Sequence, residues 1–275
     1  MKTFGRPILA FVLFLVIQLV VSMMVIFPVT IFKGMKQAAE TGSVSPEQLG
    51  QSSSMLTLTS IALILSSIVT IIFMWKPMGM VNFKESFSGL GIDVRRAVLV
   101  VLAAYVGVFG FNLISEMIDL PNIIEAQLTG MSATVLGFLA ISLVGPVAEE
   151  VTMRGAIQGW LHKHEVKPWV AILFASFLFG VMHLNPAQIP FAMIMGIILG
   201  VVYWRTGSLV LPCIIHIINN TIACILMNTV GEDYLMYEHL GGKGPTILLA
   251  LGCIMISAAG LYWQLKPAGS KKVAE

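Results

Sequence analysis

The sequence predicts an all-α fold, a polytopic membrane bundle of about eight transmembrane helices, on three observations. Hydrophobic residues make up 57% of the 275 residues and charged residues only 11%, against about 25% charged in soluble domains. The mean hydropathy is +0.90, so most of the chain requires lipid rather than water around it. The apolar residues also fall into runs close to the ~20 residues that a helix needs to span a bilayer.

Eight runs meet or approach this length. They cover residues 8–32, 55–75, 97–117, 133–160, 168–183, 187–204, 209–228 and 245–265. The fifth is short in apolar residues, and the fourth continues past the bilayer edge. The first is longer than the ~7–15 residues of a signal-peptide core and shows no small-residue cleavage site, so we expect it to be retained as a span.

The connections between these runs are short and hold polar or turn-forming residues, so no separate soluble domain is expected. We divide the chain into residues 1–130 with spans one to three, residues 131–230 with spans four to seven, and residues 231–275. The last segment holds the final span and a basic tail with Lys271 and Lys272.

Lysine and arginine are distributed unevenly between the two sides of this predicted bundle. With the N-terminus in the cytoplasm, 13 of them fall in inside segments and 3, at Lys33, Lys36 and Lys243, in outside segments. Because positive charge concentrates on the cytoplasmic side, we expect both termini inside. The membrane is expected to be a bacterial plasma membrane. The net charge of +2 gives no electrostatic basis for nucleic-acid binding.

Ionisable residues in the fourth span carry the first functional information. A charged side chain at the centre of a spanning helix costs ~2.5–3.5 kcal/mol on insertion scales, so such residues face a partner or a cavity. Glu150 and Arg154 are four residues apart and lie on one helix face, where they can pair. Glu149 is rotated by about 100° from Glu150. Arg154 cannot neutralise both, so Glu149 is predicted to be the freer carboxylate.

Three further polar residues lie in the fifth and seventh spans. His183 falls about 22 Å from the cytoplasmic start of its span, and Glu149 lies about 18 Å deep by the same rise per residue. His216 and Asn220 are four residues apart on one face, about 12–18 Å deep. Because three helices place these groups at overlapping levels, we expect one intramembrane site that opens to the cytoplasmic side.

Two chemistries suit these residue types. Glu149, His183 and His216 could form the ligand set of a catalytic zinc ion, two histidines and one glutamate. Without a metal, a carboxylate and an imidazole can activate a water molecule, while a second histidine and an asparagine amide stabilise the developing oxyanion. A cysteine nucleophile is a poor fit, since Cys213, one turn from His216, has no orienting partner in the sequence.

Three motifs appear in order along the chain: EExxxR at Glu149–Arg154, FxxxH at Phe179–His183 and HxxxN at His216–Asn220. They resemble the motifs of the CPBP family of intramembrane proteases, the superfamily of CAAX prenyl endopeptidases and of bacteriocin-processing and self-immunity proteins. The resemblance covers about residues 136–228. Within it, Gly196–Gly200 resembles the link to the last motif, and its GxxxG spacing also predicts close helix packing inside the chain.

The resemblance implies an endopeptidase that hydrolyses a peptide bond of a membrane-associated, prenylated or otherwise hydrophobic substrate. It implies that Glu149 is the base that activates water, and that His183 orients this water or shares its proton. His216 and Asn220 would form the oxyanion site, supported by the pair Glu150–Arg154. The segment 131–230 would then be the catalytic core.

Alternatives remain open at the level of the sequence. No cofactor is expected, and zinc held by Glu149, His183 and His216 is the alternative. A non-proteolytic immunity or scaffold protein that retains the site is a second function. A proton-coupled carrier is a third, although the polar residues cluster and do not form a path across the membrane.

Overall fold

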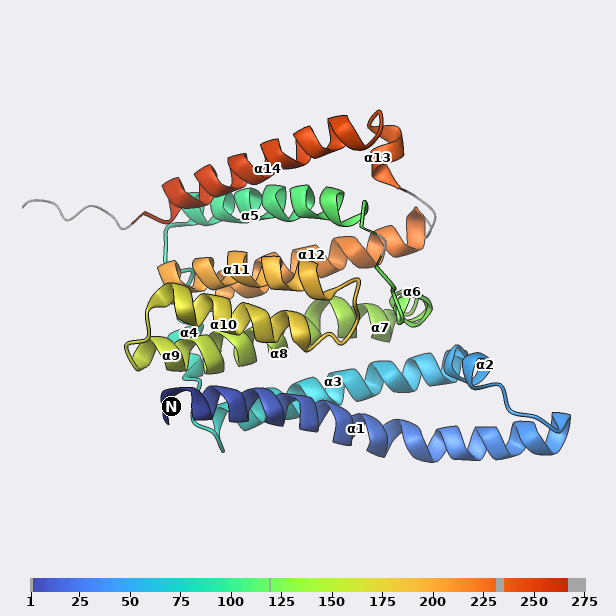
Figure 1. The fold of residues 1–275 in the computed structure, drawn as a ribbon. Coiled ribbons are helices and arrows are strands. Elements are labelled where there is room, and N and C mark those ends of the chain that lie inside the picture. The colour runs from blue at the N-terminus through green and yellow to red at the C-terminus, as the bar shows by residue number, and fades with distance from the viewer. Residues whose placement is uncertain (1, 119, 231–234, 267–275) are drawn as a thin grey trace, which may run out of the picture.

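The structure, a computed structural model, describes residues 2–118, 120–230 and 235–266, which fold into helices without a strand (Figure 1). The prediction of an all-α membrane bundle is confirmed. The helices are α1 (Lys2–Thr41), α2 (Pro46–Gly50), α3 (Ser53–Trp75), α4 (Phe83–Ser86), α5 (Val94–Ser115), α6 (Glu125–Ser132), α7 (Val135–Leu139), η1 (Ala140–Val144), α8 (Gly145–Glu150), η2 (Val151–Gln158), α9 (Gly159–Lys163), α10 (Pro168–Val181), α11 (Ile189–Thr206), α12 (Val210–Thr229), α13 (Met236–His239) and α14 (Lys243–Gln264). The segments α7 to α9 form one continuous helix, Val135–Lys163, which we call the long central helix. Lys271 and Lys272 of the predicted tail lie outside the described residues.

Seven helical stretches of the described chain are long and apolar enough to cross a membrane, one fewer than the eight predicted spans. The exception is α10, whose 14 residues extend only about 21 Å against a hydrocarbon core of ~30 Å. It ends at Val181 because Leu184 adopts a left-handed conformation with φ of 51° and Pro186 cannot continue a helix. The short fifth run therefore forms a helix that is too short to cross a bilayer by itself.

The amino end of α1 and the carboxyl end of α14 lie at the same end of the bundle (Figure 1). We call this the terminal end, and we call the opposite end, which carries α2, α6 and α13, the distal end. Helix ends at the terminal end hold Arg6, Lys76, Arg95, Arg96, Lys167, Arg205 and Lys266. Arg154 is buried inside the bundle, so it is not one of the charges at the cytoplasmic surface that the sequence analysis counted. The asymmetry of Lys and Arg between the two ends persists without it. That the terminal end is cytoplasmic stays a prediction from this asymmetry.

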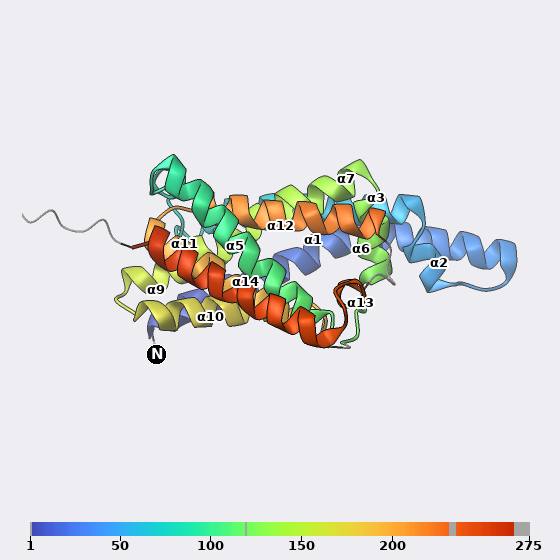
Figure 2. The ribbon, with the colours of Figure 1, turned by 90° about the horizontal axis from the view of Figure 1, so that it is seen from above.

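The helices form three layers (Figures 1 and 2). The pair α1 and α3 lies on one side, the pair α5 and α14 lies on the other, and the long central helix with α10, α11 and α12 lies between them. Glycine allows the outer pair to pack closely, since a Cβ at Gly107 of α5 would lie 2.3 Å from Oγ of Ser257 in α14. The predicted polar residues all belong to the middle layer, where helices on both sides separate them from lipid.

Candidate active site

The long central helix is irregular, with π-helical turns at η1 and η2. In η1 the N–H of Gly145 bonds to the carbonyl of Ala140 rather than to that of Ile141. The next donor that could reach Ile141 belongs to Pro146, which has no N–H. The carbonyl of Ile141 is therefore left for a side chain, and π-helical turns of this kind are frequent at functional sites.

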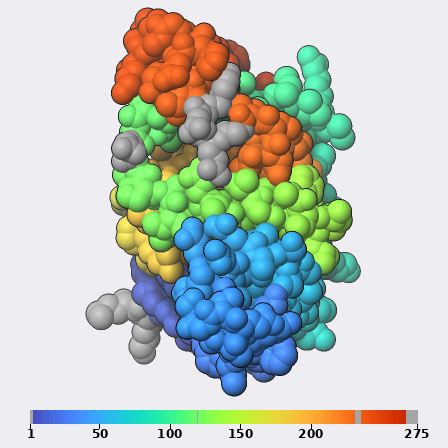
Figure 3. Space-filling view, turned by 90° about the vertical axis from the view of Figure 1, so that its right-hand side faces the viewer, coloured from blue at the N-terminus to red at the C-terminus, as the bar shows by residue number. Residues whose placement is uncertain are grey.

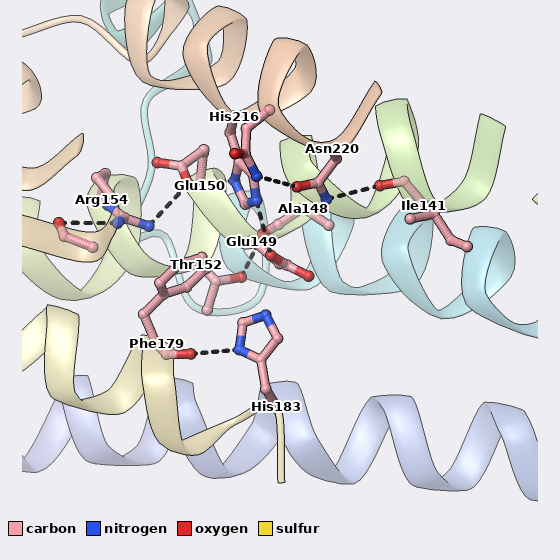
Figure 4. Close-up of polar contacts among 12 residues, drawn as sticks. Ile141, Ala148, Glu149, Glu150, Thr152, Arg154, Phe179, His183, His216 and Asn220 are labelled. Carbon is pink, nitrogen blue, oxygen red and sulfur yellow. Dashed lines mark hydrogen bonds and ion pairs between the residues drawn. The ribbon is translucent and has the colours of Figure 1, made fainter. Parts of the chain in front are cut away.

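Asn220 of α12 forms a hydrogen bond with that carbonyl. Its Nδ2 donates to the carbonyl oxygen of Ile141 at 3.0 Å, and its Oδ1 accepts from Nδ2 of Asn219 at 3.1 Å (Figure 4). Nδ2 carries two hydrogens, and the bond to Ile141 uses one of them. The predicted oxyanion role of Asn220 therefore depends on the second hydrogen.

The structure contains the predicted pair of Glu150 and Arg154. Nη1 of Arg154 lies 2.9 Å from Oε1 of Glu150, and the two side chains are 1% and 0% exposed. Nη2 of Arg154 donates to the carbonyl of Gly196 at 3.1 Å, and the guanidinium lies 4.6 Å from the ring centre of Phe179. A charge buried this deeply persists only when paired and hydrogen-bonded, and the arginine meets both conditions.

Gln158 is a buried neighbour of the site that the motifs do not include. It lies one turn after Arg154, is fully buried, and donates from Nε2 to the carbonyl of Gly200 at 2.8 Å. Arg154 and Gln158 thus bind the carbonyls of the two glycines of the GxxxG stretch in α11. The signal available in the sequence was the spacing of four residues from Arg154, which places both side chains on one helix face.

Replacing Gly196 with alanine is expected to destabilise the protein by about 1–3 kcal/mol, the usual cost of overpacking. The new Cβ would lie 2.9 Å from Cβ of Ser176 and would displace the carbonyl that Arg154 binds. Gly252→Ala in α14 is the matched control, because no atom lies within 4 Å of that Cβ. Thermal unfolding in detergent measures both variants, and equal midpoints for the two would contradict this packing.

His216 of α12 lies between two carboxylates of the long central helix (Figure 4). Its Nδ1 lies 2.8 Å from Oε1 of Glu150, and its Nε2 lies 3.6 Å from Oε2 of Glu149. An ionised carboxylate only accepts hydrogen bonds, so Nδ1 carries the hydrogen that Glu150 accepts. A further proton, on Nε2 or on Glu149, makes the second contact attractive. Glu150 therefore both pairs with Arg154 and orients His216.

Glu149 is more exposed than its neighbour, as helix phase predicted, with 21% of its side chain exposed against 0% for Glu150. Its ionic contact is with His216, and in the described part of the chain it has none with His183. The sequence grouped Glu149 with His183, whereas the geometry couples it to His216. That coupling arises because α12 packs directly on α8.

His183 lies just beyond the end of α10 and not inside a span, because the helix ends at Val181. Its Nδ1 contacts the carbonyl of Phe179 at 2.8 Å and must donate to it, which leaves Nε2 as the nitrogen available to a ligand. The ring of Phe179 packs edge-on against His183 at 5.2 Å and against His216 at 5.5 Å. Phe179 therefore spaces the two imidazoles.

A cavity of about 230 Å³ lies beside these groups. Its lining includes His183, His216 and Asn220 among mainly apolar side chains, as is usual for a substrate site. Glu149 is not part of the lining, but its Oε2 lies 3.6 Å from Nε2 of His216, which is. The lining continues to Leu128 of α6 and to residues near the end of α12, so the cavity extends toward the distal end.

This direction differs from the predicted opening on the side of the N-terminus. Toward the terminal end the middle layer is filled by Arg154, Gln158 and Leu161, which are 0–1% exposed. Toward the distal end α10 stops early and leaves room. Residue counting along a helix measures depth, but the packing of neighbouring helices decides on which side a buried group is reached.

The donor side chains among the described residues are not arranged as a zinc site. Within residues 2–118, 120–230 and 235–266, no group of three or more His, Cys, Asp and Glu side chains is arranged to hold a metal ion. Glu149 and His216 present two donors 3.6 Å apart, and His183 does not complete a set with them. Catalytic zinc takes three protein ligands, so the zinc set of the sequence analysis does not fit this geometry.

Comparisons with known proteins find similarity over the part of the chain that holds this site. Residues 131–222 match the family described as Rce1-like, type II CAAX prenyl endopeptidase. The curated "Putative membrane peptidase YdiL" of Bacillus subtilis (strain 168) is 29% identical over 111 residues, which are 40% of this chain and 45% of that protein. The match thus spans less than half the length of this relative. No solved structure matches the chain.

The matched segment contains all seven residues that the three motifs specify, together with Gln158 and both glycines of the GxxxG stretch. It coincides with the middle layer of the bundle, where the structure brings these residues together. This integral membrane protein is therefore similar, through residues 131–222, to the Rce1-like family of type II CAAX prenyl endopeptidases.

Proposed function

We propose that the chain is an intramembrane endopeptidase that hydrolyses a peptide bond of a membrane-associated substrate with a water molecule activated by Glu149. The observation that carries the proposal is the position of His216. This residue joins Glu149 to the buried pair of Glu150 and Arg154 and lines the cavity. The family match supports the same class of reaction.

In this proposal Glu149 takes a proton from water while the water oxygen attacks the carbonyl carbon of the scissile bond. The proton then passes to the leaving nitrogen, the C–N bond breaks, and a carboxylate and an amine leave. General acid–base catalysis of this kind contributes ~10²–10⁴-fold. His183 offers Nε2 to the same water, since its Nδ1 is held by Phe179.

The developing oxyanion needs hydrogen-bond donors, and two of them line the cavity. They are Nε2 of His216, when protonated, and the second Nδ2 hydrogen of Asn220. A second hydrogen bond orients each of these side chains: His216 donates to Glu150, and Asn220 donates to the carbonyl of Ile141. Removal of one such donor typically costs ~10²–10³-fold in turnover, because fixed donors need no reorganisation during the reaction.

Cleavage of a defined pair of peptides tests this function. The full chain in proteoliposomes is given one hydrophobic peptide with and without a C-terminal prenyl group, and products are identified by mass spectrometry. The proposal expects hydrolysis of one peptide bond. Preference for the prenylated form would assign CAAX-type processing, and equal cleavage would assign a broader hydrophobic specificity. If neither peptide is cut by folded protein, the non-proteolytic immunity or scaffold role is favoured instead.

Metal chelation is expected to leave peptide turnover unchanged. The described residues offer two close donors and no three-ligand set, whereas a catalytic zinc ion would need three. Turnover is measured before and after dialysis against a strong chelator, with bound metal determined in the same sample. Loss of activity that added zinc restores would contradict this expectation.

A further inference from the structure

The distal end of the bundle is open at the level of the site because α10 is short. Its 14 residues start at the terminal end and fall roughly 9 Å short of a ~30 Å hydrocarbon core at 1.5 Å per residue. His183 and the following loop to Gln188 therefore lie inside the bilayer. Non-helical backbone is tolerated there only where protein buries it or where it lines a water-filled cavity.

A second loop holds this one in place. Nδ2 of Asn185, a fully buried residue, donates to Oδ1 of Asn122 at 2.7 Å. Oδ1 of Asn185 accepts from the backbone N–H of Ile123 at 3.1 Å. The segment after residue 123 continues into α6. The loop therefore forms a fixed polar wall beside the site cavity, and α6 lies next to that wall.

Two more cavities share lining residues, one with the site cavity and the other with its neighbour, toward the distal end. The first, of about 210 Å³, shares Leu128 and Ile141 with the site cavity. The second, of about 360 Å³, shares Thr59 and Gln127 with the first. The three cavities form a row that leads from His216 along α6 to the turn between α1 and α3.

The middle cavity of this row carries hydrogen-bonding side chains at a depth where lipid-facing helices are apolar. They are Gln18 and Ser22 of α1, Thr59 of α3 and Gln127 of α6. Ser66 donates to Oε1 of Gln18 at 2.5 Å, which fixes the amide of that glutamine. Donors and acceptors of this kind match a peptide backbone, which must keep its hydrogen bonds when it leaves water. A hydrocarbon chain would gain nothing from them.

The row begins outside the hydrocarbon core. α1 has 40 residues and extends about 60 Å, and it reaches with α2 beyond the other helices (Figure 1). Its last turns carry an exposed ion pair of Lys36 and Glu40 at 3.8 Å. The outermost cavity, lined by Pro46 and Gly50 of α2, therefore faces water. Figure 3 looks onto this end, where α6 and α7 (green) lie between the α1–α3 region (blue) and α12 (orange).

We propose that the substrate is a polypeptide segment on the non-cytoplasmic face of the membrane, which enters between α1, α3 and α6 and reaches the site along this row. The side follows from the basic residues at the terminal end, because positive charge marks the cytoplasmic face. Gln18, Ser22, Thr59 and Gln127 hydrogen-bond its backbone on the way. That this substrate is cleaved depends on the function proposed above, whereas the route by which it enters does not depend on that function.

Cysteine accessibility tests the route without requiring activity. In the full chain with Cys213, Cys224 and Cys253 changed to alanine, single cysteines replace Gln127 on the row or Lys167 at the terminal end. A membrane-impermeant maleimide added to intact cells is expected to label Gln127→Cys, and to label Lys167→Cys only after the membrane is opened. Labelling of both from the same side, or of Gln127→Cys from the cytoplasm alone, would overturn the proposal.

A second variant keeps this test decisive if Gln127→Cys does not fold. Gly50→Cys lies at the outer cavity, where a Cβ has no atom within 4 Å, and it is expected to react from the outside as well. If Lys167→Cys reacts from outside intact cells and Gly50→Cys does not, the row of cavities lies on the cytoplasmic side. That result would overturn the proposed entry from the non-cytoplasmic face.

A large side chain placed in the row of cavities tests whether the substrate passes along it. Gln127→Trp is expected to lower kcat/KM for a membrane peptide about tenfold or more, because a displaced substrate loses its reactive geometry. Leu248→Trp is the control, since that side chain is 72% exposed on α14. Unchanged turnover in Gln127→Trp would overturn the route. Outside labelling without any peptide cleavage by the parent chain would leave the route standing and count against the proposed function alone.

Discussion

Replacing Glu149 with glutamine is expected to lower peptide turnover by ~10²–10⁴-fold, the usual contribution of a general base, without lowering thermal stability. The side chain is 21% exposed, and its contact with His216 is 3.6 Å long, which is too long for a hydrogen bond. Its loss therefore removes little packing. Glutamine keeps the shape of the side chain but cannot accept a proton from water.

Turnover in proteoliposomes and thermal unfolding in detergent check this prediction on the same preparations. Glu40→Gln is the matched control, because Glu40 is 62% exposed and its pair with Lys36 lies far from the site. Both variants are expected to unfold at the parent midpoint, and only Glu149→Gln is expected to lose activity. Turnover of Glu149→Gln equal to that of the parent would exclude Glu149 as the base.

Replacing Arg154 with methionine is expected to destabilise the protein by about 3–5 kcal/mol, because it leaves a buried charge without its partner. Glu150 is 0% exposed, so water cannot replace the guanidinium. Methionine fills much of the arginine stem and limits the loss of packing. Activity is expected to fall as well, since Glu150 also accepts the hydrogen bond that orients His216.

The double variant Glu150→Gln with Arg154→Met separates these two effects. It contains no uncompensated charge, so it is expected to recover much of the stability lost in Arg154→Met, as neutral replacements of buried pairs often do. Turnover is not expected to recover, because His216 lacks its carboxylate partner. A double variant no more stable than Arg154→Met would show that the pair is not the origin of the loss.

The helices themselves could be predicted because hydropathy is a local property of the chain. The eight predicted runs correspond to observed helices within a few residues at most ends, apart from α1, which extends beyond both predicted boundaries. α10 was predicted to span the membrane but is too short to do so, and part of the reason was visible in the sequence. Its apolar run was short, and Pro186 lies just beyond it. The left-handed conformation of Leu184 and the hydrogen bond between Asn185 and Asn122 were visible only in the structure.

The sequence by itself determined which residues form the candidate site and how they are arranged along each helix. Spacing of four residues placed Glu150 with Arg154 and His216 with Asn220, and a rotation of about 100° per residue set Glu149 apart. Only the tertiary structure decided that His216 contacts both glutamates, that Gln158 binds the GxxxG stretch, and that the cavity extends toward the distal end. The reason is physical: helical phase is set within one segment, whereas contacts and openings depend on which helices pack together and on where each one stops.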